Sequence, residues 1–276
     1  MIIVIDALNK QDFPAILDDM FRLRARVFGD RLGWEVEIKN GQEKDKFDAL
    51  DPAYVIGLDD DGHVVSCVRA LQTTGPHMLS DVFSSILHGE PPLRSATVWE
   101  STRFCVDTQR LGRGTAPNSV SYATCELMIG SLEYARRSGI KDIVTVIDPV
   151  MDRVLKRSDN APYGYVGKTT PMGKVPAMAA LLDCSQERID RVRNFAGIQG
   201  EVFADEARLR ETQRVRFDAA KMPASSIRDN LFEYLREQFH AAGSDEERNA
   251  VERLAAQLHA SAALTTSSPV MDNRIH

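Results

Sequence analysis

The feature that most constrains the fold is an alternation of apolar, strand-like runs with amphipathic, helix-like ones. A β-hairpin is indicated first, because two β-rich runs at 54–58 and 64–71 flank the turn sequence Asp59-Asp-Asp-Gly62. A strand-like run at 97–106, a helical pattern at 116–138 and another strand-like run at 141–147 follow. An antiparallel hairpin followed by strands that alternate with helices indicates a mixed α/β sandwich.

The flanking segments extend this pattern at both ends. A short strand at 2–5 precedes an amphipathic helix at 11–27, and a short basic helix is expected at 149–157. From Cys184 onward the sequence becomes charged and helix-forming. We therefore expect a principal domain at 1–185, a helical extension at 186–263 and a disordered tail at 264–276.

Composition and charge exclude several classes of protein. With 27% charged residues and a net charge of −6, the chain resembles a soluble globular protein and not a general nucleic-acid binder. No apolar run is long enough to span a membrane, and the first acid, Asp6, comes too early for a signal peptide. The four cysteines have no metal-ligand spacing. We expect a cytoplasmic protein without metal, nucleic-acid or membrane partners.

The stretch Trp99-Glu100-Ser101-Thr102-Arg103-Phe104 places two charges in the strand expected at 97–106. A buried strand accepts such groups only if they are paired or used, because desolvating an unpaired charge is costly. One interpretation is a structural Glu–Arg pair that joins the sheet to a helix, and the other is a functional site. A regular strand would place Glu100 and Arg103 on opposite faces, so their joint participation requires a bulge.

Two further segments carry residues suited to ligand binding. The segment 28–50 has no clean period but contains three aromatic residues and the acids Glu43, Asp45 and Asp48. An irregular segment of this length is usually functional or disordered, and the aromatic residues favour function. The glycines at 112 and 114 precede a helical pattern, which suits either phosphate binding or a tight turn.

Several separated motifs, spread over roughly residues 1–180, together resemble one enzyme family. They are Leu23-Arg24, Val27-Phe28, Arg31, Gly33-Trp34, Glu43-Lys-Asp45-Lys-Phe-Asp48, Arg69, Thr74-Gly-Pro76 with Met78-Leu79, and Trp99-Glu100 with Arg103-Phe104. In these residues the chain resembles the LuxI-type acyl-homoserine lactone synthases. The resemblance implies an acetyltransferase-like (GNAT-like) three-layer α/β/α sandwich, here with a C-terminal helical extension.

The implied reaction transfers an acyl group from an acyl thioester to the amine of S-adenosylmethionine. Lactone closure then releases methylthioadenosine, and the product is a quorum-sensing signal. Both reactants are substrates, so no cofactor is expected. Glu100 is the candidate base for the amine, directly or through water, and Arg103 is the second candidate catalytic residue.

The resemblance also assigns residues to the two substrates. Those expected to bind S-adenosylmethionine are Arg24, Phe28, Trp34, Asp45, Asp48, Arg69 and Phe104. Guanidinium groups bind carboxylates, acids can bind an amine or ribose, and aromatic faces accept a cation or adenine. Core packing remains the alternative for Phe28 and Trp34. The expected acyl-chain pocket comprises Met78, Phe83, Trp99, Leu127, Val144, Thr145 and Val146, although such apolar residues would form core in any case.

The acyl donor implied by the resemblance is usually acyl carrier protein, which is strongly acidic. Arg153, Lys156 and Arg157 form the best local basic patch for it, with solvated surface as the alternative. Thr145 could hydrogen-bond a substituent at the acyl 3-position. For the helical extension, the possible roles are packing, homodimerisation and carrier docking.

Two other functions stay open. A GNAT-type N-acyltransferase that uses acyl-CoA on another amine would explain Gln109 to Gly114, which match that superfamily's pyrophosphate-loop pattern. It would not explain why Arg24, Trp34 and Asp45 occur together. The same loop leaves acyl-CoA open as the donor of a synthase. A ligand sensor without turnover is the third possibility. Acyl-chain length and 3-substitution cannot be read from the sequence.

Overall fold

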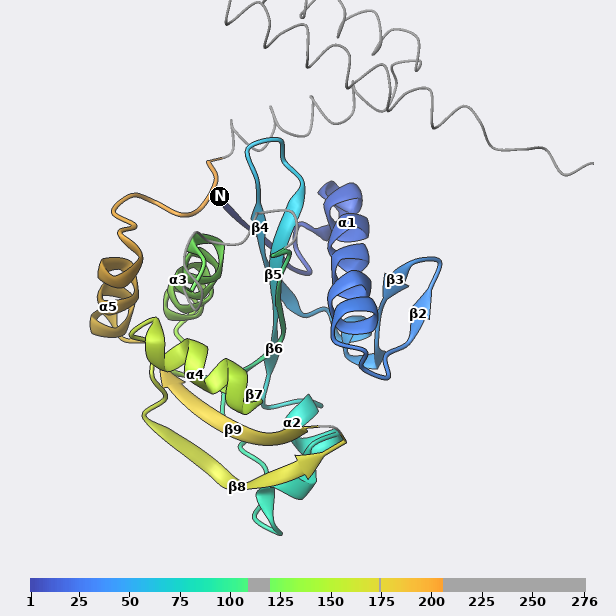
Figure 1. Cartoon of the computed structure of the whole chain (residues 1–276), viewed down its shortest axis with the longest axis vertical. Helices are drawn as coiled ribbons and strands as arrows, with labels where there is room; N and C mark the ends of the chain where they lie inside the picture. The colour runs from blue at the N-terminus through green and yellow to red at the C-terminus, as the bar shows by residue number, and fades with distance from the viewer. Residues whose placement is uncertain (109–119, 174, 206–276) are drawn as a thin grey trace, which may run out of the picture. The chain divides into compact units, whose positions relative to one another are not determined.

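The computed structural model describes residues 1–108, 120–173 and 175–205 (Figure 1). The chain divides into two compact units, Met1–Thr212 and Gln213–His276. The extension after residue 205, the tail at 264–276 and the glycine-containing loop at 109–115 lie outside the described residues. Among the residues that are described, no helix is long and apolar enough to cross a membrane.

A seven-stranded sheet forms the centre of the first unit, in the order β1-β4-β5-β6-β7-β9-β8. Its strands are β1 (Ile2–Ile5), β4 (Ala53–Leu58), β5 (Val64–Gln72), β6 (Val98–Val106), β7 (Asp142–Ile147), β8 (Gly164–Met172) and β9 (Val175–Asp183). The strands β6 and β7 are parallel, and every other neighbouring pair in this sheet is antiparallel. The expected hairpin at 54–71 is confirmed as β4 and β5. A separate small ladder joins β2 (Ile38–Lys39) to β3 (Gln42–Glu43).

Helices cover both faces of this sheet, which confirms the expected α/β/α sandwich (Figure 1). Helix α1 (Pro14–Arg24) lies on one face, and α3 (Tyr122–Arg137) and α5 (Gln186–Ala196) lie on the other. The shorter helices are α2 (Met78–Asp81), α4 (Pro149–Arg157), the 3₁₀ turns η1 (Lys10–Asp12), η3 (Lys46–Leu50) and η4 (Ser84–Leu87), and the π-helical turn η2 (Ala25–Arg31). Helix α3 crosses from the end of β6 to the start of β7, which is how these two strands can be parallel.

Each face of the sheet has its own apolar core. On the α3 face, Val68, Leu127 and Ile143 belong to one large buried cluster. On the α1 face, Met20 of the helix packs with Ile56 of the sheet in a second cluster. The apolar side chains alternate along the strands between these clusters, as expected for a sheet buried on both faces.

Residues beyond 185 contribute to the first of these cores. Ile189 and Val192 of α5 are fully buried in the cluster that contains α3. The chain then reaches the edge strand β1, where the Ile2 N–H donates to the Val202 carbonyl at 2.7 Å and the Ala204 N–H donates to the Ile2 carbonyl at 2.8 Å. The expected boundary at residue 185 therefore falls inside the first unit and not at its end.

Candidate active site

A β-bulge in β6 brings the charged residues of the central strand onto one face. Between the pairs Cys67–Cys105 and Arg69–Thr102, β6 contains one more residue than β5, and Arg103 in this interval has a left-handed φ of 55°. The bulge turns Arg103 onto the face that already carries Glu100 and Thr102, and the Thr102 hydroxyl there accepts a 3.0 Å hydrogen bond from the Arg69 Nε. The bulge required for joint participation of Glu100 and Arg103 is thus present.

A fully buried ion pair joins α1 to β3, and the same arginine also binds η3. The Arg24 Nε donates to Glu43 Oε2 at 2.6 Å, and the other two guanidinium nitrogens donate to the two oxygens of Asp48 at 2.8 and 3.0 Å. The Arg24 and Glu43 side chains have no solvent exposure. Glu43 belongs to one of the motifs that resemble the LuxI-type synthases, but it was not among the expected site residues. Its place as the first of three acids at 43, 45 and 48 is the sequence signal that pointed to it.

Two more arginines extend the pair into a network. The buried Arg69 donates to Asp45 at 2.6 Å and to Asp48 at 2.8 Å. Arg103 lies 3.0 Å from Glu43 and 2.8 Å from Asp45. The structure therefore joins the predicted Arg24, Arg69, Arg103, Asp45 and Asp48, with Glu43, into one cluster of three cations and three anions. The network is balanced in charge.

Electrostatics lower the pKa values of two acids of this network, Asp48 and Asp45. Burial alone would raise the pKa of Asp48, but hydrogen bonds and the charge of Arg24 outweigh it and hold that pKa well below its ordinary value. Arg69 has the same effect on the pKa of Asp45. Only Asp45, with 19% of its side chain exposed, and Arg103, with 11%, reach solvent appreciably. A ligand that enters this face therefore meets one carboxylate and one guanidinium.

Glu100 has different partners from those that the sequence suggested. Its two carboxylate oxygens accept hydrogen bonds of 2.6 Å from the backbone N–H groups of Met78 and Leu79, at the start of α2. The structural interpretation as a Glu–Arg salt bridge is therefore wrong, because backbone amides hold this carboxylate. Burial raises the pKa of Glu100 to about 7, although the two backbone hydrogen bonds act in the opposite direction. A carboxyl group with such a pKa can exchange a proton near neutral pH.

Aromatic side chains line the solvent side of the network. Phe28 and Trp34 stack with ring centroids 5.2 Å apart, and the Arg103 guanidinium lies 5.5 Å from the Phe28 centroid. Phe28 is buried, whereas Trp34 is 45% exposed and can offer a ring face to a ligand. The expected ligand residue Phe104 instead packs against the core on the α3 face. It lies across the sheet from the network.

The structure divides the expected acyl-chain residues between the two faces of the sheet, with Phe83 packing against both clusters on the α2 side. Met78 packs with Phe83 beside the arginines, and its Sδ lies 3.3 Å from Arg69. Val144 and Val146 pack against η4 and β9 on the same side as α2. Trp99 and Leu127 belong to the core on the α3 face, and Thr145 faces that side because strand residues alternate. The seven residues therefore lie on two faces of the sheet, and their role as an acyl-chain pocket stays a prediction.

The pairing between the parallel strands β6 and β7 ends near these residues. They pair only from Val98–Asp142 to Ser101–Thr145, although β6 continues to Val106 and β7 to Ile147. Beyond Ser101 and Thr145 the strands diverge, so each presents backbone groups that its neighbour does not use. We call the place where this pairing ends the opening between β6 and β7; Glu100 lies on one face of the sheet beside it and Thr145 on the other.

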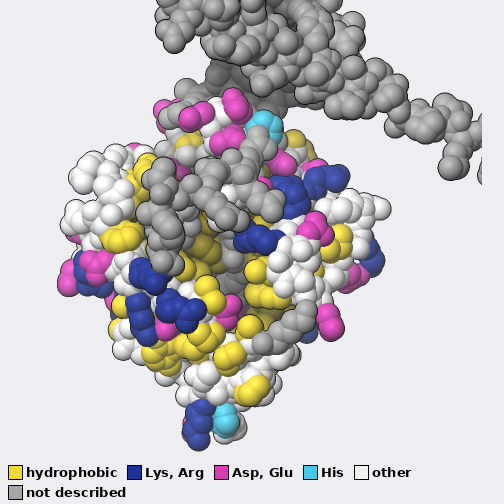
Figure 2. All heavy atoms as spheres, viewed as in Figure 1, with side chains coloured by type: hydrophobic (Ala, Val, Ile, Leu, Met, Phe, Trp, Pro, Cys, Tyr) yellow, Lys and Arg dark blue, Asp and Glu magenta, His cyan; other side chains and the backbone are white. Residues whose placement is uncertain are grey.

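A basic surface lies next to this opening, on α4. Figure 2 shows lysine and arginine side chains gathered over this helix. The three expected residues, Arg153, Lys156 and Arg157, are all exposed. Lys156 is partly neutralised by Asp152 at 2.7 Å, and the second Asp152 oxygen accepts a 2.6 Å hydrogen bond from the Tyr165 hydroxyl.

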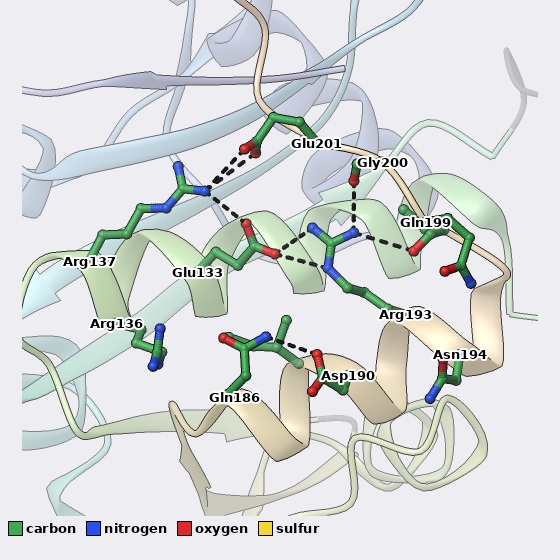
Figure 3. A pocket seen from close by; sticks show the side chains of 12 residues that line it. Glu133, Arg136, Arg137, Gln186, Asp190, Arg193, Asn194, Gln199, Gly200 and Glu201 are labelled. Atoms are coloured by element: carbon green, nitrogen blue, oxygen red, sulfur yellow. Dashed lines mark hydrogen bonds and ion pairs between the residues drawn. The ribbon is translucent and has the colours of Figure 1, made fainter.

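A cavity of about 600 Å³ lies elsewhere, between α3 and α5 (Figure 3). Arg193 of α5 donates to Glu133 of α3 and to the Gly200 carbonyl, and Arg137 donates to Glu133 and Glu201. These contacts hold α5 and the following loop on α3. None of the expected site residues lines this cavity, and we interpret it as a structural junction.

Comparisons with known proteins point to one family. A family model described as autoinducer synthase matches residues 9–192. An acyl-homoserine-lactone synthase of Agrobacterium fabrum is 37% identical over 180 residues, which cover 65% of this chain and 84% of that protein. A protein of the same description from Rhizobium radiobacter is 34% identical over 192 residues, 70% of this chain and 90% of its own.

Solved structures show the same likeness. The CoA-dependent acyl-homoserine lactone synthase MesI superposes with a TM-score of 0.63 and 27% identity, and covers 74% of this chain and all of its own. The synthase LasI superposes with a TM-score of 0.60 and 26% identity over 73% of this chain and 98% of its own. Both resemblances extend over the acetyltransferase-like sandwich described above.

Proposed function

The chain belongs to the autoinducer synthase family and is an acyltransferase, and on this premise we propose that it acylates the amine of S-adenosylmethionine and closes the product to an acyl-homoserine lactone. The observation that best supports this choice of acceptor is the buried network of three arginines and three acids. It presents only Asp45 and Arg103 to solvent, beside the exposed ring of Trp34. A carboxylate and a guanidinium side by side suit the ammonium and carboxylate of an amino acid.

S-adenosylmethionine fits this arrangement group by group. In the proposed complex, the substrate amine lies by Asp45 and the substrate carboxylate by Arg103. The exposed face of Trp34 receives the adenine or the sulfonium cation. The remaining members, Arg24, Glu43, Asp48 and Arg69, are too buried to exchange their partners for a ligand, so we assign them to holding Asp45 and Arg103 in place.

Glu100 is proposed as the acceptor of the amine proton. The amine nitrogen forms a bond to the thioester carbonyl carbon, the carbon–sulfur bond breaks, and the proton passes through Glu100 to the departing thiolate. Each Glu100 oxygen uses one lone pair for a backbone N–H, which leaves a lone pair for this transfer. The carboxylate of the acylated S-adenosylmethionine then attacks its own γ-carbon, and the bond from that carbon to the sulfonium sulfur breaks, which closes the lactone and releases neutral methylthioadenosine. Nothing in these steps requires a cofactor.

The thioester is proposed to enter through the opening between β6 and β7. This opening leads to both Glu100 and Thr145, so the carbonyl can lie on one side while the acyl chain extends to the other. The basic surface of α4 suits an acidic donor, and we propose acyl carrier protein. A relative described as CoA-dependent makes acyl-CoA the second candidate donor. The expected homodimer stays a prediction.

The donor can be tested by reversing charge on α4. Arg153→Glu combined with Arg157→Glu should raise KM for a carrier-linked donor about tenfold or more, because opposite charges would be replaced by like charges. The same pair should leave KM for the corresponding acyl-CoA nearly unchanged. Arg136→Glu, an exposed reversal on α3, is the matched control. Equal effects on both donors would contradict the carrier contact.

The reaction itself can be tested with purified protein, S-adenosylmethionine and a series of acyl donors. Mass spectrometry should detect an acyl-homoserine lactone together with an equal amount of methylthioadenosine. Acylation of other amines without a requirement for S-adenosylmethionine would instead establish the GNAT-type N-acyltransferase. Binding of S-adenosylmethionine without any product would establish the sensor.

A further inference from the structure

A small cavity lies between α3 and the sheet, on the face reached through the opening between β6 and β7. Its volume is about 10 Å³, which is roughly the room of one water molecule. Among the residues that line it are Ala70, Trp99, Ser101, Ser131, Tyr134 and Ile143. Three of these six side chains are small, and the two large aromatic ones come from opposite walls.

The lining residues lie in a definite order of depth. Ser101 and Thr145 form the last pair of β6 and β7 before the strands diverge. Trp99 and Ile143 form the pair two residues earlier, roughly 6.6 Å deeper along strands that rise about 3.3 Å per residue. A chain that enters by Ser101 and Thr145 therefore reaches Trp99 next.

The residues of α3 that face the sheet also lie at increasing depth from the opening. It returns from the end of β6 to the start of β7, so it runs antiparallel to both strands. Leu127, Ser131 and Tyr134 are spaced by four and three residues, which places them on one helix face at successive depths. Leu127 thus lies nearest the opening, and Tyr134 lies opposite Trp99 at the deep end.

The two aromatic rings meet at that end. Trp99 and Tyr134 have ring centroids 5.5 Å apart at an interplanar angle of 44°. The Tyr134 hydroxyl donates to Asp6 Oδ2 at 3.3 Å, which tethers the ring to the loop after β1. A tethered pair of rings is a firmer barrier than either ring alone.

We propose that the Trp99–Tyr134 pair is the closed end of the acyl site and restricts the enzyme to short acyl chains. The inference rests on the proposed function, because it concerns the acyl group of that reaction. Ser131 and Ala70 leave the remaining space just in front of the barrier. The preferred acyl group is therefore one whose terminal methyl ends in this cavity.

The test is a competition among acyl donors in one reaction. Butanoyl, hexanoyl, octanoyl, decanoyl and dodecanoyl thioesters are mixed in equal amounts with S-adenosylmethionine, and the lactones are quantified by mass spectrometry. Trp99→Ala and Tyr134→Ala should each shift the ratio of longer to shorter products about tenfold or more toward longer chains, and Ser131→Leu should shift it toward shorter ones. Product ratios do not depend on how much of each variant is folded.

Leu132→Ala is the matched control, because Leu132 is a buried residue of α3 that does not line the cavity. It should lower the yield of folded protein and leave the product ratio unchanged. Lactone formation with the same ratio in all three cavity variants would overturn the inference and leave the proposed function intact. Absence of any lactone from the unaltered protein would overturn the proposed function itself. Because Ser131→Leu removes no packing, it keeps the inference open to refutation if the aromatic variants do not fold.

Discussion

Glu100→Gln should abolish a pH-dependent loss of stability that the unaltered protein shows between about pH 4.5 and 7. The glutamine side chain has the shape of the protonated acid and does not titrate. Both oxygens of Glu100 accept backbone N–H groups at the start of α2, in a site where burial raises its pKa to about 7 from the ordinary 4.5. The folded protein therefore binds this proton more tightly than the unfolded chain.

The sign and size of the effect follow from that difference. The stabilisation that protonated Glu100 contributes is fully present below the unfolded pKa of 4.5, and it is lost as the pH rises through about 7. A pKa displaced by this amount corresponds to about 3 kcal/mol of unfolding free energy. Asp45 and Asp48 act in the opposite sense, because their pKa values are lowered, but their contribution changes only in more acidic solution.

Urea denaturation at a series of pH values measures this directly. The free energy of unfolding of the unaltered protein should fall by about 3 kcal/mol relative to Glu100→Gln between about pH 4.5 and 8. The exposed Glu187→Gln should give a curve parallel to that of the unaltered protein. In the same proteins, the rising limb of kcat/KM through about pH 7 should vanish with Glu100→Gln. Parallel stability curves for Glu100→Gln and the unaltered protein would refute the reasoning.

Three further substitutions test other parts of the structure. Arg24→Ala should cost about 3–5 kcal/mol in urea denaturation, because it leaves buried carboxylates unpaired, whereas Arg22→Ala at an exposed pair should cost less than about 1 kcal/mol; equal costs would contradict the buried network. Gly167→Ala should destabilise the fold well beyond the 1–2 kcal/mol of a left-handed residue, because its Cβ would overlap an η4 carbonyl, whereas Gly173→Ala has open space and should cost only that amount. Thr145→Val should change the ratio of 3-substituted to unsubstituted lactones, as measured by mass spectrometry, and an unchanged ratio would remove Thr145 from substrate selection.

Patterns of local sequence predicted the elements that bear the site. The hairpin at 54–71, the central strand and the helix before β7 all follow from apolar periodicity and turn chemistry. The same geometry required a bulge if Glu100 and Arg103 were to act together, and the structure places it at Arg103. Alternation along β7 also places Val144 and Thr145 on opposite faces of the sheet, so the expected acyl-chain residues are divided between the two faces.

The ion-pair and hydrogen-bond partners of the site residues could not be predicted from local sequence patterns. Which acid each arginine binds depends on how η3 and β3 are positioned against α1, and no local period reports that position. Glu100 accepts hydrogen bonds from the backbone N–H groups of Met78 and Leu79. Because almost every residue has a backbone N–H, the residue types at 78 and 79 could not have predicted this contact. The exposure that distinguishes Asp45 from Asp48 likewise depends on packing between distant segments.

The closure of β1 by residues 202–204 has a consequence for how the chain is made. Ile2 joins Val202 and Ala204 across about 200 residues, so this edge of the sheet remains open during synthesis until that segment has left the ribosome. Contacts of such long sequence separation form late in folding. Until then, an apolar edge strand is available to other chains and requires protection from aggregation. A version of this protein that ends before residue 202 would carry that exposed edge permanently.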